Sequence, residues 1–185
     1  SSALFANTTA SNNTAVGESA LFSNTTGNEN TALGKGALDA NTTASNNTAV
    51  GVQALRFNTT GTYNTAIGRS ALYSNTTANN NTAVGYGGLS ANTTGASNVA
   101  VGTSALQSYP GSFNNTAIGK SADENGTSGN GNISIGYNAQ KSAVNSAGQC
   151  TLGDANITNL RCNDTTISSL SDQRDKTDII DSPYG

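Results

Sequence analysis

Apolar and polar positions follow one another along this chain in a pattern that repeats every 17 residues. Each unit holds two short apolar patches, "SAL" near its start and "NTAVG" at its end, separated by a stretch rich in Asn, Thr and Gly. The period is marked without interruption by Gly17, Gly34, Gly51, Gly68, Gly85, Gly102, Gly119, Gly136 and Gly153. Self-similarity at a fixed period is typical of stacked repeat architectures. The pattern therefore predicts nine stacked units that end at Gly153.

The length and composition of the unit favour strands over helices. Seventeen residues are too few for a helical hairpin repeat, which needs about 33 or more. Asn, Thr and Gly are also poor helix formers that favour turns. We expect two short strands and two turns in each unit. Nine such coils, stacked at about 4.8 Å, predict an all-β parallel β-solenoid (β-roll) about 43 Å long over residues 1–153.

Two aliphatic columns are the expected core. The leucine of "SAL" recurs as Leu4, Leu21, Leu38, Leu55, Leu72, Leu89 and Leu106. The residue before each corner glycine is always aliphatic: Val16, Leu33, Val50, Ile67, Val84, Val101, Ile118, Ile135 and Leu152. Because strand side chains alternate between faces, Thr14 shares the side of Val16 and Ala15 points the other way. We expect the aliphatic face inside, and the alanine face outside as a surface on which identical chains pack.

Polar positions complete the expected scaffold. A side-chain ladder at the start of the second strand is predicted for Asn13, Asn30, Asn47, Asn64, Asn81, Asn98, Asn115 and Asn132. The recurring glycine marks a corner that needs positive φ. In the eighth unit Asp123 takes the place of leucine within "DENGTSGNGN", which lacks the EF-hand spacing and predicts a surface turn.

Composition narrows the function. Only 34% of the 185 residues are hydrophobic, which is too few for a conventional packed globule. A net charge of −3, without a basic patch, argues against a nucleic-acid partner, and no apolar run is long enough for membrane insertion. No arrangement of residues suggests an enzyme, a metal site or a cofactor. We expect Cys150 and Cys162 to be small buried residues, with a single disulfide as the alternative.

Two stretches resemble known families. The "SNVAVG" at 97–102 and "GNISIG" at 131–136 resemble repeats of trimeric autotransporter adhesin heads, in which a left-handed parallel β-roll trimerises through one strand face. Similar "NTAVG" arrays occur in phage tail-fibre proteins. The "SDQRDKTDI" at 171–179 resembles the start of the intramolecular chaperone domain of phage tail fibres, tail spikes and endosialidases. This resemblance implies a shaft over 1–153, a short β connector over 154–170 and the beginning of that chaperone domain over 171–185.

The tail-fibre resemblance also implies a function. In that family the chaperone assembles the trimer and then cuts itself off, which would make Ser171 the nucleophile and Lys176 its base in the full-length precursor only. Apart from that processing we expect no enzyme activity. The resemblance implies a homotrimeric, structural and adhesive rod in a virion surface appendage, which is extracellular. Its partners would be other appendage proteins and a host cell-surface receptor such as a glycan.

Other interpretations stay open at this point. Stacked threonines could order water, as in an ice-binding solenoid, with one column formed by Thr8, Thr25, Thr42, Thr59, Thr76 and Thr93. A second column begins at Thr14, but Val99, Ile133 and Cys150 interrupt it and suggest that it is buried. The "NTT" triplets match the N-glycosylation pattern at Asn7, Asn24, Asn41, Asn58, Asn75 and Asn92. A binding patch is best sought among exposed turn residues that vary between units, including Phe5, Phe22, Arg56, Tyr63 and Tyr73.

Overall fold

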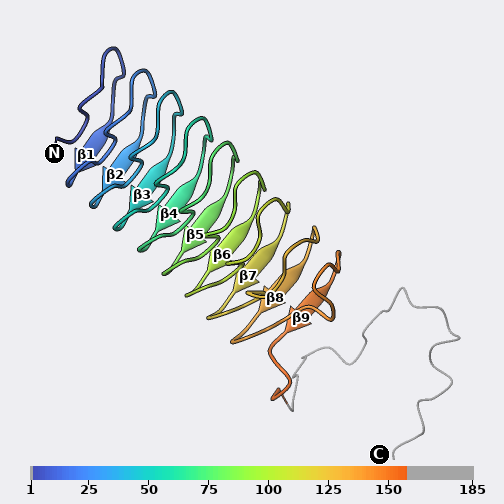
Figure 1. The fold of residues 1–185 in the computed structure, drawn as a ribbon. Coiled ribbons are helices and arrows are strands. Elements are labelled where there is room, and N and C mark those ends of the chain that lie inside the picture. The colour runs from blue at the N-terminus through green and yellow to red at the C-terminus, as the bar shows by residue number, and fades with distance from the viewer. Residues whose placement is uncertain (1, 158–185) are drawn as a thin grey trace, which may run out of the picture.

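The computed structural model, which describes residues 2–157, is a straight stack of coils (Figure 1). Each coil contributes one strand of three residues to a single parallel sheet in chain order. The strands are β1 (Thr14–Val16), β2 (Thr31–Leu33), β3 (Thr48–Val50), β4 (Thr65–Ile67), β5 (Thr82–Val84), β6 (Val99–Val101), β7 (Thr116–Ile118), β8 (Ile133–Ile135) and β9 (Cys150–Leu152). Of the predicted connector only 154–157 is described, and the predicted chaperone segment at 171–185 lies outside the described residues.

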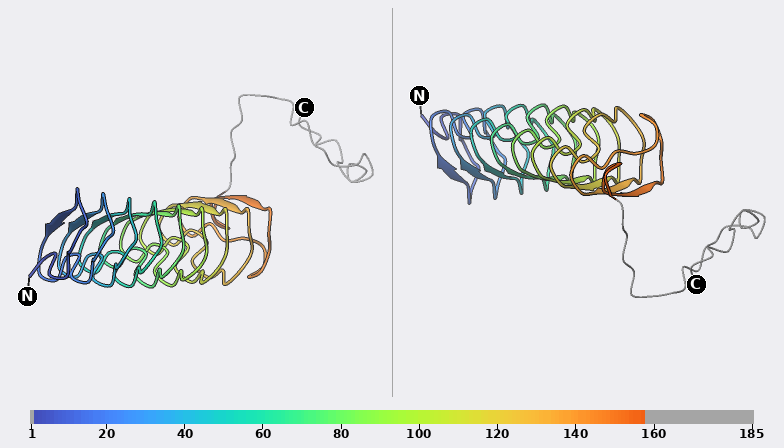
Figure 2. Two further views of the ribbon diagram at one scale, coloured as in Figure 1. Left: turned by 90° about the horizontal axis from the view of Figure 1, so that it is seen from above. Right: turned by 90° about the horizontal axis from the view of Figure 1, so that it is seen from below.

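The register of the sheet is set by the 17-residue period. Thr14 pairs with Thr31 and Ala15 with Ala32, and each later strand pairs in the same way with its neighbour. Equivalent positions therefore form columns along the rod. Both views in Figure 2 show the coils stacked from one end of the rod to the other. The prediction of an all-β parallel β-solenoid with nine 17-residue coils is confirmed. We number the coils 1 to 9, each ending at its corner glycine, so that coil 4 is 52–68.

The prediction of two strands per coil is wrong, because the "SAL" patch forms a turn. Its leucines adopt a left-handed backbone, with φ near 50° at both Leu21 and Leu72, which no β-strand contains. Hydrogen bonds still link this turn to the next coil, as where the Leu21 N–H donates to the Ala37 carbonyl at 3.0 Å. The coils are thus joined by backbone hydrogen bonds well beyond the three-residue strands.

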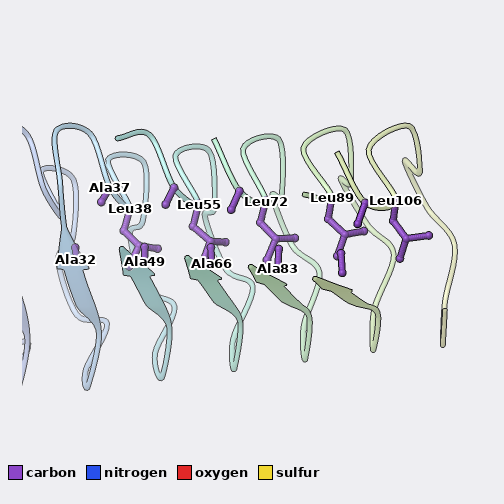
Figure 3. Close-up of a cluster of buried hydrophobic side chains, with 14 of the residues drawn as sticks. Ala32, Ala37, Leu38, Ala49, Leu55, Ala66, Leu72, Ala83, Leu89 and Leu106 are labelled. Atoms are coloured by element: carbon purple, nitrogen blue, oxygen red, sulfur yellow. The ribbon is translucent and has the colours of Figure 1, made fainter. Parts of the chain in front are cut away.

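The core assignment is correct for the leucines and wrong for the strands. Leucines of the turn are buried from Leu21 to Leu106. Figure 3 shows those from Leu38 to Leu106 pointing toward the strands, whose alanines point back at them. Ala32 and Ala66 are fully buried, whereas Leu33 is 46% exposed and Ile67 is 40% exposed. The space between sheet and turn holds one leucine from the turn, so the facing strand position has room only for a methyl group.

The corner glycines are required by both conformation and space. Gly68 has φ 128°, which disfavours every residue with a side chain. A Cβ placed on it would also lie 2.5 Å from the carbonyl oxygen of Gly85 in the next coil. The expectation of a positive-φ corner is confirmed.

Two asparagine columns line the polar end of the core. The predicted ladder is confirmed, since the Asn47 N–H donates to Asn30 Oδ1 at 3.0 Å and the Asn64 N–H donates to Asn47 Oδ1 at 3.0 Å. A second column, which the sequence analysis treated only as glycosylation motifs, is also buried from coil 2 to coil 6. Within it, Asn58 Nδ2 donates to Asn41 Oδ1 at 3.0 Å.

Candidate recognition face

Most of the charged and aromatic residues of the coils lie on one turn. The first six residues of each coil form the turn after the corner glycine, and their third and fourth positions point into the core. Of the ten charged residues in 2–153, all except Glu29 and Asp123 stand at the first or fifth position of a coil. We call the first, second, fifth and sixth positions the variable face. Because the other positions carry the scaffold, this face can change in sequence without disturbing the fold.

Four of the five residues singled out for a binding patch share the fifth column of this face. The rings of Phe5 and Phe22 stack with centroids 5.0 Å apart. Farther along, Arg56 Nη1 lies 3.5 Å from the hydroxyl oxygen of Tyr73. Tyr63 stands apart, at the twelfth position of its coil. The sequence analysis missed Tyr86, which occupies the first column and is 55% exposed.

Two neighbouring grooves run between the columns of the variable face. One, of about 210 Å³, is lined by charged residues of coils 2 to 4, including Glu18, Lys35, Asp39 and Arg56. They form ion pairs, with Lys35 Nζ 2.8 Å from Glu18 Oε2 and Arg56 Nε 3.6 Å from Asp39 Oδ2. The other groove, of about 370 Å³, lies over coils 4 to 7. Gln53 lines both grooves.

The outer face of the sheet is the second candidate surface, and it differs from the expected one. We expected alanines to form the contact surface between chains, but the outward positions hold threonine and an aliphatic residue, as in Thr65 and Ile67. Val99 is partly exposed and Ile133 is 42% exposed, so the threonine column is an outer one and not a buried one. No charged residue occurs in any of the nine described strands.

A buried polar cluster closes the core in coils 7 to 9. Tyr109 replaces the asparagine of its column, and its hydroxyl donates to Asp123 Oδ2 at 2.5 Å. Lys141 Nζ lies 4.7 Å from the centroid of the Tyr109 ring and donates to the Ser128 carbonyl. The prediction of a surface turn at Asp123 is wrong for this residue, which is 1% exposed. Burial and the hydrogen bond to Asp123 raise the pKa of Tyr109, and burial lowers the pKa of Lys141.

This cluster ends the asparagine column in a way that leaves polar atoms without partners. A tyrosine cannot supply the amide donor that each asparagine gives to the coil before it, so the Oδ1 of Asn92 accepts no hydrogen bond. The Oδ1 of Asp123 and the Oγ of Ser134, which replaces a core alanine, are also buried without a partner. Coils 7 to 9 therefore depart most from the regular scaffold.

The remaining predicted sites are placed only in part. Ser171 and Lys176 lie outside the described residues, as does Cys162. Cys150 is a free cysteine on the outer sheet face, which contradicts its expected burial. Within 2–157 no group of three His, Cys, Asp or Glu side chains could hold a metal ion.

The glycosylation pattern and the first threonine column have structural explanations. Five of the six "NTT" asparagines, Asn24 to Asn92, are fully buried, so their amides are inaccessible to a glycosyltransferase in the folded rod. Thr25 Oγ1 donates to the carbonyl of Thr42 at 3.0 Å, and its column repeats this bond from Thr8 to Thr93. These hydroxyls therefore donate their hydrogen bonds to backbone carbonyls of the next coil and not to water.

In the described part of the chain no helix is long and apolar enough to cross a membrane. No protein-family model, curated protein or solved structure matches this chain.

Proposed function

We propose that the chain is a structural and adhesive rod of a phage-like tail fibre or virion appendage, which displays a recognition face to the host. The observation that carries this proposal is the division of the surface. Scaffold columns repeat almost unchanged through coils 1 to 6, while aromatic and charged residues change from coil to coil on the variable face. Such a division suits a stiff support that presents side chains at fixed spacing.

The rod assembles as a homotrimer through the outer sheet face. Its aliphatic column, which includes Ile67 at 40% and Ile118 at 41% exposure, forms an apolar stripe along the whole rod. Contiguous apolar stripes of this length are typical of contact surfaces. A partner stays in register along the stripe only if its own rise per coil is the same, and a second copy of this chain meets that condition. Three copies are the number that the family resemblance implies.

The assembly is tested by the native mass of the purified rod. We expect the mass of three chains, reduced to one chain by Ile67→Asp, which places a charge in the stripe. Thr77→Asp is the matched control, because Thr77 is exposed outside the strands and the variant should remain trimeric. A wild-type rod that is monomeric at micromolar concentration would contradict the proposed assembly.

A second candidate, ice binding, is favoured by one observation. Threonines stand at the first outward position of six strands at the spacing of the coils: Thr14, Thr31, Thr48, Thr65, Thr82 and Thr116. An exposed, regular threonine column can order water only if no partner covers it. A monomeric wild-type rod that shows thermal hysteresis, and loses it in Thr65→Tyr, would support ice binding over the fibre function.

A further inference from the structure

The groove over coils 4 to 7 is lined in part by a glycine of the variable face. Gly87 occupies the second position of coil 6, where coils 5 and 7 carry Ser70 and Ser104. A Cβ at Gly87 would meet only Gln107 Nε2, at 3.9 Å, so the glycine leaves space that a serine would narrow. The groove has a volume of about 370 Å³, which lies within the range of small-ligand sites.

The lining combines aromatic rings with neutral hydrogen-bonding groups. Tyr73 and Tyr86 contribute rings, Gln53 and Gln107 contribute amides, and the rest of the lining is serine, glycine and alanine. None of the nine described residues that line the groove is charged. Amides and hydroxyls both donate and accept hydrogen bonds. The lining therefore complements a neutral ligand that has many hydroxyl groups and flat C–H faces to stack on tyrosine.

One of the two rings is held in place before any ligand arrives. The Tyr73 ring packs edge-on against Phe57, with centroids 5.0 Å apart, and Arg56 contacts the Tyr73 hydroxyl. The backbone beneath is fixed by coil-to-coil hydrogen bonds, such as Ser74 N–H to the Ser90 carbonyl at 3.0 Å. A fixed ring loses little conformational entropy on binding, which favours affinity.

The length of the groove along the rod axis sets the size of the ligand. Its lining residues extend from Gln53 in coil 4 to Gln107 in coil 7, which is three coil rises, or about 14 Å along the axis. This span exceeds one pyranose ring and suits a short oligosaccharide lying along the rod. The charged groove over coils 2 to 4 is a poorer candidate because its charges already form ion pairs.

We propose that the groove between Tyr73 and Tyr86 binds a neutral oligosaccharide, which would be the receptor class of the adhesive rod proposed above. The inference rests on that function, but the site lies within one chain, on the turn. Figure 3 shows that this turn and the strands lie on opposite sides of the core. Assembly through the sheet therefore leaves the groove open.

The test measures binding of maltotriose, cellotriose, mannotriose and triacetylchitotriose to the intact rod by saturation-transfer NMR and calorimetry, with sialyllactose as the anionic comparison. We expect at least one neutral oligosaccharide to bind and sialyllactose to bind at least tenfold more weakly. Gly87→Ser and Tyr86→Ala should each weaken binding at least tenfold. Gly87→Ser should fold normally, because serine already adopts the same left-handed conformation at Ser70, with φ 57°.

Matched controls separate the groove from general effects. Gly36→Ser makes the same substitution at the equivalent position of coil 3, and Tyr63→Ala removes an exposed tyrosine outside the variable face. Both should bind within twofold of wild type. Absence of binding to all four neutral sugars, preference for sialyllactose, or binding unaffected by Gly87→Ser and Tyr86→Ala would each overturn the inference. The native mass of the same samples reports on the proposed assembly independently, so a trimer without sugar binding contradicts only the groove.

Discussion

Replacing Asn58 by alanine tests the buried asparagine column. Its Nδ2 donates to Asn41 Oδ1 at 3.0 Å and to the Gly61 carbonyl at 2.9 Å, and its Oδ1 accepts from Asn75 Nδ2 at 2.9 Å. Alanine removes these three bonds from a fully buried position. The coil would lose one hydrogen bond within itself and one side-chain hydrogen bond to each neighbouring coil.

The three bonds do not contribute equally to the loss. The Gly61 carbonyl keeps a donor in Asn47 Nδ2 at 2.8 Å, and Asn75 Nδ2 keeps the Ala78 carbonyl at 3.1 Å. Each of those two lost bonds should therefore cost about 1 kcal/mol, whereas the Asn41 oxygen loses its donor, which costs about 1–3 kcal/mol. We expect Asn58→Ala to lower the free energy of unfolding by about 3–5 kcal/mol.

Asn92→Ala is the matched control in the same column. Its own Oδ1 already lacks a partner, because Tyr109 follows it in the next coil. The substitution leaves Asn75 Oδ1 without a donor but removes the existing unpaired oxygen, so these two effects nearly cancel. The Gly95 carbonyl still accepts from Asn81 Nδ2 at 2.8 Å. We expect a loss of only about 1 kcal/mol.

Urea denaturation followed by circular dichroism, at one protein concentration for both variants, measures the difference. Hydrogen exchange of amides in coils 3 to 5 shows whether the loss is local, as nearest-neighbour coupling in a repeat stack predicts. Equal losses for Asn58→Ala and Asn92→Ala, or a loss below about 1 kcal/mol for Asn58→Ala, would refute the assignment of stability to the amide ladder.

Three further predictions follow from single positions. Gly68→Ala should lower the free energy of unfolding by about 2–6 kcal/mol through left-handed strain and a clash with the next coil. Gly36→Ala, whose Cβ would make only an ordinary contact with Gln53 Cγ at 3.8 Å, should cost about 1 kcal/mol in the same denaturation assay, and similar losses would argue against the clash. Ser134→Ala removes a buried hydroxyl that has no partner and should raise the melting temperature, by about 1 kcal/mol of stability, and a lower melting temperature would contradict this. Because the pKa of Tyr109 is raised in the folded state, its contribution to stability is present below pH 10 and is lost above it. The pKa of Lys141 is lowered in the folded state, so its effect on stability becomes more favourable as the pH rises toward its ordinary pKa of 10.5. Above that pH its effect no longer changes. In an alkaline titration of phenolate absorbance, one tyrosine should ionise only on unfolding, and this step should be missing in Tyr109→Phe.

The candidate recognition face was only partly predictable. Variation between units pointed to Phe5, Phe22, Arg56 and Tyr73, because a position that changes within a regular repeat is not needed to maintain the fold. Their spacing by multiples of 17 residues also places these four in one column. The sequence did not reveal that Gly87 lies beside a groove. In a glycine-rich repeat the sequence does not show which glycine lies beside a groove. The positions of the neighbouring side chains are needed to show the free space beside Gly87.

The sequence by itself determined the stacking, the register and the corners. A strict 17-residue period predicts that each residue lies beside its equivalent in the next coil, as the strand pairing shows. The invariant glycine marks the position at which each coil turns. Alternation also established that Thr14 and Val16 lie on one side of the strand and Ala15 on the other.

Only the tertiary structure decided which of those sides faces inward. The leucine reaching across from the turn, held at φ near 50°, fills the interior, so the strand can contribute only alanine there and its larger aliphatic residues face outward. Hydrophobicity alone favoured the opposite arrangement, because it ranks valine above alanine without regard to available volume. The contact of Tyr109 with Asp123 was also decided by the tertiary structure, because both side chains are buried in the core, whereas the sequence predicted Asp123 in a surface turn.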